Sequence, residues 1–523
     1  MCNKTTMIAL ALLAATTTAQ QIGKQKANLN PGMTSQTCTK SGGCTSEQTK
    51  VTMDANWRWL HKEGTSSNCY TGNSWDSTAC PDGKTCASNC GLDGIPEADW
   101  TGTYGASATG SDLSLKLVTK GPYSKNVGSR TFLLDADGQN YKMFHLLNRE
   151  FTFDVDLSKL GCGLNGALYF VEMDKDGGMS KYPANKAGAA YGTGYCDAQC
   201  PHDIKFIDGE ANSEGWKPSS TDKNAGTGKY GSCCNEMDIW EANSFSTAVT
   251  PHSCSVQGQY RCTGVECGDD SSGDRFKGVC DKNGCDFNPY RLGHTNFFGP
   301  GSNFTVDSTK PMTVVTQFIT TDGTDDGDLK EIKRIFVQNG KTIPLPDAQV
   351  GGKTFNSVTD ELCDARSAAF ADDNSFEKKG GLKAMGESLK RGMVLVMSLW
   401  DDHAVNMLWL DSSYPTDQIG KPGVARGPCG IDTGKPDDVE TNQADSTVKY
   451  YNIKSGEIGS TFSGGSGPAP GPAPGPAPGP APGPGPSPSG CPGGSMSSCI
   501  GLCPSNPAPA YKACVQSCVT RCN

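Results

Sequence analysis

The stretch FTFDVDL, residues 151 to 157, alternates apolar Phe, Phe, Val and Leu with polar Thr, Asp and Asp. A period of two puts the apolar side chains on one face of an extended chain, so the stretch predicts a β-strand with one buried face. Five further runs are rich in β-branched and apolar residues and predict strands in the same way: LSLKLV from Leu113, ALYFVEM from Ala167, TVVTQFI from Thr313, MVLVMSLW from Met393 and NMLWLD from Asn406.

Helical patterning is scarce, and KGGLKAMGESLKRG at 379 to 392 is the best candidate for a helix. Many strands at irregular spacing, joined by long loops that contain glycine and cysteine, are typical of two packed antiparallel sheets. The sequence therefore predicts an all-β fold, a β-sandwich or jelly roll.

The two ends of the chain differ in composition from its middle. Residues 1 to 19 combine Lys4, an apolar run and small residues before Gln20, which is typical of a cleaved secretory signal. Residues 463 to 490 are a Pro/Gly/Ala repeat, which at roughly 3.1 Å per residue makes a semi-rigid linker of up to about 85 Å. These boundaries predict a catalytic domain at 20–462 and a C-terminal module with six cysteines at 491–523.

Composition narrows the location and the partners. The 25 cysteines favour an oxidising, extracellular compartment, and removal of Cys2 with the signal leaves an even number for disulfides. A metal-rich intracellular protein is the alternative, but the cysteines lack zinc-ribbon spacing. The formal net charge of -10 disfavours nucleic acid and anionic membranes as partners, whereas a neutral polysaccharide remains compatible with it. No other segment is apolar enough to span a membrane.

The segment GSCCNEMDIWEANS, residues 231 to 244, is the best candidate for chemistry. Glu236 and Asp238 are two residues apart and share a strand face, whereas Glu241 lies at an odd spacing from Glu236 and belongs to the opposite face of a regular strand. A β-bulge between them would restore the phase, and bulges are frequent beside active sites. In a flat strand Glu236 and Glu241 would stand about 16 Å apart, so curvature must bring their side chains together.

Two carboxyl groups that converge to about 5 to 5.5 Å fit retaining glycoside hydrolysis, in which one attacks the anomeric carbon and the other protonates the leaving oxygen. Asp238 would then orient Glu236 and help to separate the carboxyl pKa values. The alternative for an E-x-D-x-x-E match is an acidic strand face that is simply solvated.

The chain resembles glycoside hydrolase family 7, cellobiohydrolases and endoglucanases built on a curved, concanavalin A-like β-sandwich. The likeness runs from about Cys38 to Phe462 and includes the segment of residues 231 to 244. The other matching segments are DANWRW at Asp54, KNVGSR at Lys125, CGLNGALYFVEMD at Cys162, KYPANKAGAAYGTGYCDAQCP at Lys181, NPYRLG at Asn288 and VLVMSLWDD at Val394.

The resemblance implies a role for each matching site residue. Glu236 would be the nucleophile, Asp238 its partner and Glu241 the acid/base, while His252 matches a histidine near the leaving group but is as often structural. Four tryptophans, Trp57, Trp59, Trp400 and Trp409, would be glucosyl platforms rather than core residues, since sugar rings bind flat aromatic faces. The polar contacts carried over are Arg130, Asn165, Tyr169, Asp197, Gln199, Lys205, Arg275, Asp286, Arg291 and Arg426; the alternative for each is a surface residue or an ion-pair member.

The resemblance also implies a substrate tunnel, because two loops that roof the cleft in cellobiohydrolases are of full length here: residues 209 to 234 and 267 to 280. The roof tyrosine positions read Ser271 and Ala404, which predicts a roof that opens more readily. An acidic insertion, TTDGTDDGDLKE from Thr320, has no counterpart. It does not fit a calcium loop, because the twelfth position from Asp322 is Lys333.

Nine disulfides are also implied by the resemblance. The pairs are Cys38–Cys44, Cys69–Cys90, Cys80–Cys86, Cys162–Cys429, Cys196–Cys234, Cys200–Cys233, Cys254–Cys280, Cys262–Cys267 and Cys285–Cys363.

The leading interpretation is a secreted, monomeric cellulose 1,4-β-cellobiosidase that works from reducing ends and needs no metal or organic cofactor. The alternatives are an open-cleft endoglucanase with the same site and a catalytically silent glucan-binding lectin. The C-terminal module has a single aromatic residue, Tyr511, and cysteines at i, i+4 spacing, which predicts a disulfide-stapled helical hairpin. Anchoring to a protein or cell-wall component, weak glucan binding and an inert cap are its alternative roles.

Overall fold

The computed structural model describes residues 20–122, 124–269 and 274–462. The signal peptide, linker and C-terminal module predicted above lie outside these residues, and so does Ser271. Among the described residues there is no helix that is both long and apolar enough to cross a membrane.

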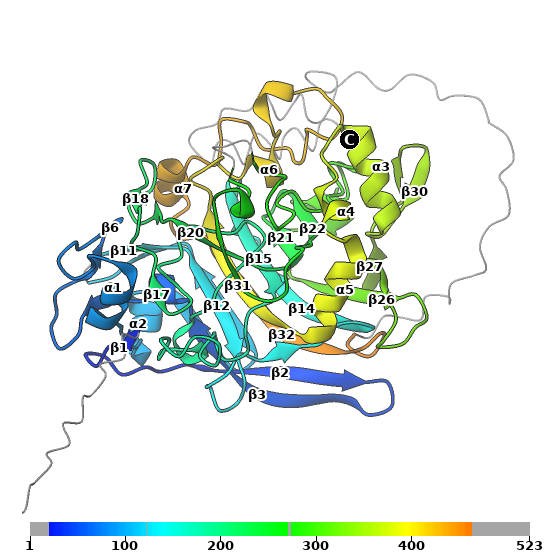
Figure 1. Ribbon diagram of the computed structural model, residues 1–523. Helices are drawn as coiled ribbons and strands as arrows, with labels where there is room; N and C mark the ends of the chain where they lie inside the picture. The colour runs from blue at the N-terminus through cyan, green and yellow to red at the C-terminus, as the bar shows by residue number, and fades with distance from the viewer. Residues whose placement is uncertain (1–19, 123, 270–273, 463–523) are drawn as a thin grey trace, which may run out of the picture.

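Fifteen strands of the described chain form one continuous sheet. Figure 1 shows β31, β15, β21 and β22 side by side in the middle of the molecule. The strands along the sheet are, in order, β22 (Thr247–His252), β21 (Glu236–Ala242), β15 (Leu164–Val171), β31 (Met393–Asp401), β12 (Ser129–Leu134), β3 (Gly43–Met53), β2 (Gly32–Thr39), β32 (Thr447–Glu457), β14 (Arg149–Asp156), β26 (Met312–Thr320), β27 (Leu329–Gln338) and β28 (Lys341–Pro344). Off this path, β13 (Met143–Phe144) pairs with β31, and β9 (Asp112–Lys116) joins β32 to β8 (Ala106–Thr109).

The sheet folds into two layers whose facing side chains form the core. On β14, Phe151 meets Phe170 of β15 with ring centroids 4.9 Å apart, and Phe153 meets Trp240 of β21 at 6.0 Å. All four rings are fully buried. The alternation in residues 151 to 157 therefore predicted both a strand and its buried face correctly.

The hairpin of β2 and β3 joins the two layers. β3 pairs with β12 in the layer that carries β15 and β21, while β2 pairs with β32 in the other layer. The pairing of Gln36–Cys38 with Lys454–Gly456 is parallel. The expectation of two separate antiparallel sheets is therefore corrected: one sheet bends back on itself, because a single long hairpin belongs to both layers.

Helices lie at the margins of the sandwich. Figure 1 shows α3 (Asp360–Phe370), α4 (Ser375–Lys378) and α5 (Gly381–Arg391) beside β27, and the predicted helix at 379 to 392 is thereby confirmed. The other α-helices are α1 (Gly83–Asn89), α2 (Glu97–Gly102), α6 (Leu408–Asp411) and α7 (Pro436–Asn442). The remaining strands are short: β1 (Gln21–Ile22), β4 (Leu60–Lys62), β5 (Tyr70–Thr71), β6 (Ser74–Trp75), β7 (Cys90–Leu92), β10 (Val118–Lys120), β11 (Lys125–Val127), β16 (Phe206–Ile207), β17 (Glu210–Ala211), β18 (Lys217–Pro218), β19 (Gly226–Thr227), β20 (Tyr230–Cys233), β23 (Tyr260–Thr263), β24 (Phe298–Gly299), β25 (Val306–Asp307), β29 (Ala348–Val350) and β30 (Lys353–Phe355).

The prediction of a strand for NMLWLD is wrong. Met407 has a left-handed backbone conformation, with φ of 61°, and α6 follows it directly. The carboxylate of Asp402 accepts backbone N–H bonds from Ala404, Val405 and Met407. Three bonds from one side chain fix a turn directly after β31, and the chain then enters a helix.

All nine predicted disulfides are confirmed. The acidic insertion forms the turn between β26 and β27, and three of its carboxylates pair with cations. Asp325 pairs with Arg149, and Asp326 and Asp328 pair with Lys390 and Lys383 of α5. The insertion therefore ties this hairpin to α5.

We expect Tyr450→Phe to lower the free energy of unfolding by about 1 kcal/mol, the usual net value of a buried hydrogen bond. The buried Tyr450 hydroxyl, from β32, lies 3.1 Å from the carbonyl oxygens of Ala167 and Ser398 in the opposite layer. Denaturant unfolding measures the difference. Tyr451→Phe, on the half-buried neighbour, is the control; equal losses in the two variants would contradict the bond between layers.

Candidate active site

A β-bulge in β21 brings the three acidic side chains to one face. Between Leu168 and Phe170, β15 advances two residues while the facing part of β21 advances three. The ladder with β22 shows the same extra residue in β21. Ile239 and Trp240 consequently both point into the core. Glu236, Asp238 and Glu241 share the opposite face, as expected if a bulge restores the phase between the two glutamates.

Neighbouring strands extend this polar face. Glu241 lies opposite Ala167, Ala167 opposite Ser398, and Ser398 opposite Arg130. Directly opposed residues of an antiparallel pair project to the same side of the sheet. The sheet thus presents Glu241 and Arg130 on one surface, with the Asp54 carboxylate 2.9 Å from Arg130 Nε.

Each glutamate has one polar partner that fixes it. Oε2 of Glu236 accepts the backbone N–H of Ala198 at 3.0 Å. Oε1 of Glu241 accepts the side-chain amide N–H of Asn165 at 3.1 Å, and the side-chain oxygen Oδ1 of Asn165 accepts the backbone N–H of Ala242. Burial, together with the charge of Asp238, holds the pKa of both glutamates well above the usual range.

Asp238 and His252 form a pair beside the glutamates. His252 is opposite Glu236 in the ladder of β21 and β22, and its Nε2 lies 3.1 Å from Asp238 Oδ2. Its Nδ1–H donates to the carbonyl oxygen of Asp281 at 2.9 Å. Burial lowers the pKa of His252, but the hydrogen bond and charge of Asp238 outweigh it and raise that pKa to about 9. His252 is therefore an imidazolium at neutral pH.

The same charge state bears on metal binding. Ligand-type atoms of Glu236, Asp238 and His252 lie close enough to one another to surround an ion. A metal ligand must be a neutral imidazole with a free lone pair. The imidazolium form of His252 has no lone pair to offer an ion.

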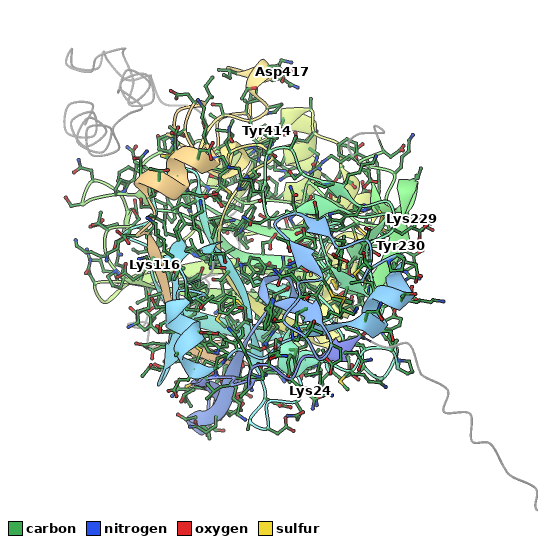
Figure 2. All side chains as sticks on the ribbon, turned by 90° about the vertical axis from the view of Figure 1, so that its left-hand side faces the viewer. Lys24, Lys116, Lys229, Tyr230, Tyr414 and Asp417 are labelled. Carbon is green, nitrogen blue, oxygen red and sulfur yellow. A yellow bond between two sulfur atoms is a disulfide. The ribbon has the colours of Figure 1, made fainter. Side chains whose placement is uncertain are left out.

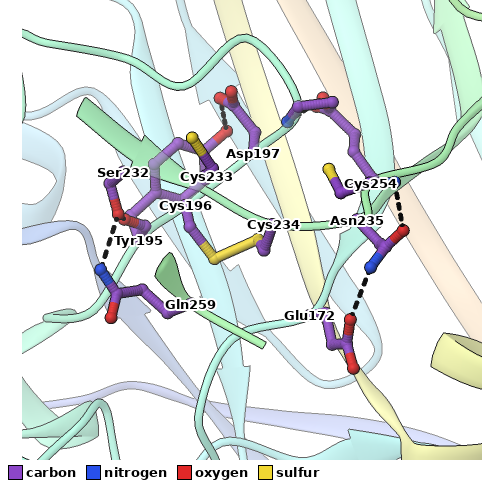
Figure 3. The surroundings of a disulfide bond; sticks show 12 residues. Glu172, Tyr195, Cys196, Asp197, Ser232, Cys233, Cys234, Asn235, Cys254 and Gln259 are labelled. Atoms are coloured by element: carbon purple, nitrogen blue, oxygen red, sulfur yellow. Dashed lines mark hydrogen bonds between the residues drawn. A yellow bond between two sulfur atoms is a disulfide. The ribbon is translucent and has the colours of Figure 1, made fainter. Parts of the chain in front are cut away.

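Tyr195 is a site residue that the sequence analysis missed. Its hydroxyl donates to Asp197 Oδ2 at 2.7 Å and lies 2.8 Å from the hydroxyl of Tyr169, and the Arg130 guanidinium lies 3.4 Å from its ring centroid. Figure 3 shows the bond from Tyr195 to Asp197. Three predicted residues, Arg130, Tyr169 and Asp197, therefore meet at one unpredicted ring, and Asp197 directly precedes the Ala198 that donates to Glu236.

The start of β21 is held by a second buried network. Asn235, which precedes Glu236, donates to Glu172 at 2.8 Å and accepts the backbone N–H of Cys254 at 2.6 Å (Figure 3). Glu172 also pairs with Arg391 of α5. The disulfide Cys196–Cys234 ties the segment of Tyr195 and Asp197 to the same point. The backbone on both sides of the Glu236 carboxylate is thus fixed.

The four predicted sugar platforms are half-buried, in contrast to the core residue Trp240. Trp400 and Trp409 stack at 6.2 Å, and the indole N–H of Trp409 donates to Asp402. Arg130 stacks on Trp57, and Trp59 donates to Asn68. Each ring therefore has a fixed orientation and keeps exposed surface.

Three predicted polar residues are held by backbone carbonyls. Gln199 and Arg275 both donate to the carbonyl oxygen of Lys282, at 2.8 and 3.2 Å. The Lys205 ammonium donates to the carbonyl oxygen of Asn56 and lies 4.4 Å from the ring centroid of Tyr70, and burial lowers its pKa to about 8.

The three remaining predicted polar residues, Asp286, Arg291 and Arg426, lie together. The carboxylate of Asp286 pairs with Arg291 at 2.5 Å and with Arg366, and Arg426 lies 3.9 Å away. The three guanidinium groups outweigh its burial and hold the pKa of Asp286 far below the usual range. Arg366 was missed because it lies on α3, far along the chain from Asp286, in a segment without a pattern.

Asp411, two residues after Trp409, joins the ends of the strands that carry the site. Its Oδ2 accepts the backbone N–H of Gly163 at 2.8 Å and the amide N–H of Asn243 at 2.6 Å. Gly163 precedes β15 and Asn243 follows β21. Asp411 is fully buried, and this burial raises its pKa to about 7.

The described domain is similar to proteins of known family and structure. The model of glycosyl hydrolase family 7 matches residues 22–462. A GH7 family cellobiohydrolase from Daphnia pulex is 57% identical with a TM-score of 0.83, over 84% of this chain and 100% of that one. The cellobiohydrolase from Melanocarpus albomyces complexed with cellotetraose is 46% identical with a TM-score of 0.79, over 84% and 99%. An endocellulase, EGI of Humicola insolens, is 39% identical with a TM-score of 0.71, over 84% and 100%.

We expect the domain to lose stability as pH rises from 5 to 8. The pKa of Asp411 is about 7 in the fold, against about 3.9 in an unfolded chain, so its contribution is full below pH 4 and is lost as pH rises through 7. Asp411→Asn should reduce the slope by up to about 1.4 kcal/mol per pH unit between these values. Denaturant unfolding at several pH values measures the slope.

Asp432→Asn is the matched control, because Asp432 is exposed. The slope should be the same in this variant as in the unmodified protein. An unchanged slope in Asp411→Asn would show that Asp411 is already ionised in the fold at pH 5.

Proposed function

Because the chain belongs to glycosyl hydrolase family 7, we propose that it hydrolyses the β-1,4-glucosidic bonds of cellulose with the carboxyl groups on β21. The observation that carries the proposal is the β21 bulge, which puts Glu236, Asp238 and Glu241 on one face. An acidic surface that was simply solvated would not bury Glu236 and Asp238 or give each of the three carboxylates a fixed partner. The same features disfavour the lectin alternative.

The proposed reaction is hydrolysis with retention. Glu236 attacks the anomeric carbon and forms a glycosyl ester, while Glu241 gives its proton to the departing oxygen; Glu241 then takes a proton from the water that cleaves the ester. Burial and the charge of Asp238 raise the pKa of both carboxyl groups and so favour a bound proton. The first step requires that proton on Glu241. The assignment of Glu236 as nucleophile follows the resemblance to the family.

Asp238 and His252 also set the charge around the two glutamates. The imidazolium of His252 bonds to Asp238, and its positive charge opposes the rise in the pKa of Glu241. Asp238 raises the pKa of both glutamates. We assign His252 to positioning Asp238, and Asp238 to setting the charge around Glu236.

Chain-end action that releases cellobiose is the finer part of the proposal. It is supported by the half-buried tryptophans, by the full-length 209–234 and 267–280 loops, and by the greater likeness to proteins named as cellobiohydrolases. An endoglucanase is the second candidate, because the Humicola insolens endocellulase also matches the whole domain.

Secretion and modular organisation belong to the same proposal. Nine disulfides in the described domain are compatible with an oxidising environment. We propose a secreted monomer whose linker at 463–490 connects the catalytic domain to the C-terminal module.

We expect Glu236→Gln and Glu241→Gln each to lower the rate of cellulose hydrolysis at least about a thousandfold, because each removes a group that acts in the transition state. Binding of cello-oligosaccharides should remain measurable by calorimetry. Glu387→Gln, on an exposed glutamate of α5, is the control with unmodified activity. Turnover within a few-fold of the unmodified enzyme in either test variant would reject the assignment.

Product analysis on cellulose separates the two kinds of cellulase. Cellobiose in excess over glucose and cellotriose is the expected result for chain-end action. A broad ladder of soluble oligomers would favour the endoglucanase, and release of no sugar would favour the lectin.

A further inference from the structure

The tip of the 209–234 loop, residues 219 to 224, contacts two different parts of the domain. Figure 1 shows β18, which precedes the tip, between β6 and α7. On the β6 side, the amide of Asn73 donates to the carbonyl oxygens of Ser219 and Asp222 at 3.0 and 3.1 Å, and the Tyr70 hydroxyl donates to Asn224. On the other side, His403 Nδ1 lies 3.0 Å from the carbonyl oxygen of Thr221.

The tip keeps its shape through its own side chains. The Ser219 hydroxyl accepts the backbone N–H groups of Thr221 and Asp222, and Asp222 accepts that of Asn224. At the base of the loop, Glu214 bonds to Lys229 and Tyr230, which Figure 2 shows next to each other at the surface. The loop thus presents its carbonyl groups as a preformed unit.

His403 is held just as firmly. It lies in the turn that Asp402 caps, between Trp400 and Trp409. A carbonyl oxygen only accepts hydrogen bonds, so Nδ1 of His403 carries the proton in this contact. The opposite nitrogen, Nε2, lies 3.4 Å from Glu440 of α7 and 4.0 Å from Asp401, and Glu440 also pairs with Lys125 of β11.

These contacts connect the two groups of predicted sugar-binding residues. The Lys205 ammonium lies over the Tyr70 ring and donates to the carbonyl oxygen of Asn56, the residue before Trp57. His403 stands between Trp400 and Trp409 in the sequence. The loop tip therefore links the segments that carry the two aromatic groups.

We propose that His403 is a specificity-determining residue: its bond to Thr221 keeps the 209–234 loop closed and favours a chain entered from its end over attack within a chain. This inference rests on the proposed cellulase function. The resemblance to the family implied that the roof opens more readily, because Ser271 and Ala404 stand at its tyrosine positions. His403 supplies a different closing contact, one residue from the exposed Ala404.

The test compares His403→Ala with His403→Asn in the full chain. Alanine removes the donor, whereas the asparagine side-chain amide can take the position of Nδ1 and still donate to Thr221. One net hydrogen bond corresponds to about a fivefold change in the open–closed equilibrium. We expect the ratio of soluble to insoluble new reducing ends on cellulose to fall by up to that factor in His403→Ala and to stay near the unmodified value in His403→Asn.

Two further variants and a second substrate make the result decisive. Asn73→Ala, which releases the other side of the tip, should lower the ratio as well. His294→Ala removes a histidine bonded to the carbonyl oxygen of Asp347 in another loop and should leave it unchanged. Turnover of a small soluble aryl β-cellobioside, which needs the carboxyl groups but no closed loop, should stay within about twofold in all four variants.

An unchanged ratio in His403→Ala, or an equal loss in His403→Ala and His403→Asn, would overturn the proposal. A loss of aryl cellobioside turnover that parallels the loss on cellulose would also overturn it, because His403 would then act on the chemistry or on folding. Failure of the proposed function would look different: the unmodified enzyme would not hydrolyse either substrate.

Discussion

The site depends on one extra residue in β21. A regular strand with Glu236 and Asp238 on the site face would send Glu241 into the core and Trp240 out of it. Burial of the charge and exposure of the large ring would each cost about 2 kcal/mol or more. The bulge avoids this conflict because Ile239 and Trp240 take two successive positions on the core side. Core packing of Trp240 against Phe153 and Phe336 therefore fixes where the carboxylates point.

Burial of the carboxylates is the second constraint. Taking acidic groups out of water raises their pKa values, and only fixed partners keep such groups oriented. Those partners come from segments that the sheet does not position: Ala198 lies on a long connection, and His252 reaches the carbonyl oxygen of Asp281 in another. Disulfides Cys196–Cys234 and Cys200–Cys233 tie the connection that carries Ala198 to the start of β21. The cysteines thereby contribute to the geometry of the site as well as to stability.

The sequence alone predicted those parts of this arrangement that repeat or alternate. A period-two run located β14, runs rich in apolar and β-branched residues located β26 and β31, and the odd spacing of Glu236 and Glu241 required the bulge. The strand predicted for NMLWLD was wrong because the turn before it is set by hydrogen bonds to the Asp402 side chain, which a hydrophobic pattern does not contain. Tyr195, Arg366 and Asp411 were missed for a related reason: each acts on groups far away in the chain, and a single residue of a common type gives no signal until the fold brings its partners together.

The sheet fixes the carboxyl groups that we propose cut the bond, but it does not fix where along a glucan they would act. Proteins named as a cellobiohydrolase and as an endocellulase both match over 84% of this chain, and we infer that the difference between them lies in the connections. The contacts that hold those connections here are a few hydrogen bonds to carbonyl oxygens, such as those from Asn73 and His403. Each contributes about 1 kcal/mol, against a reaction barrier that catalysis lowers by many times as much. Small changes in the loops can therefore alter the mode of attack while the carboxylate face of β21 stays the same.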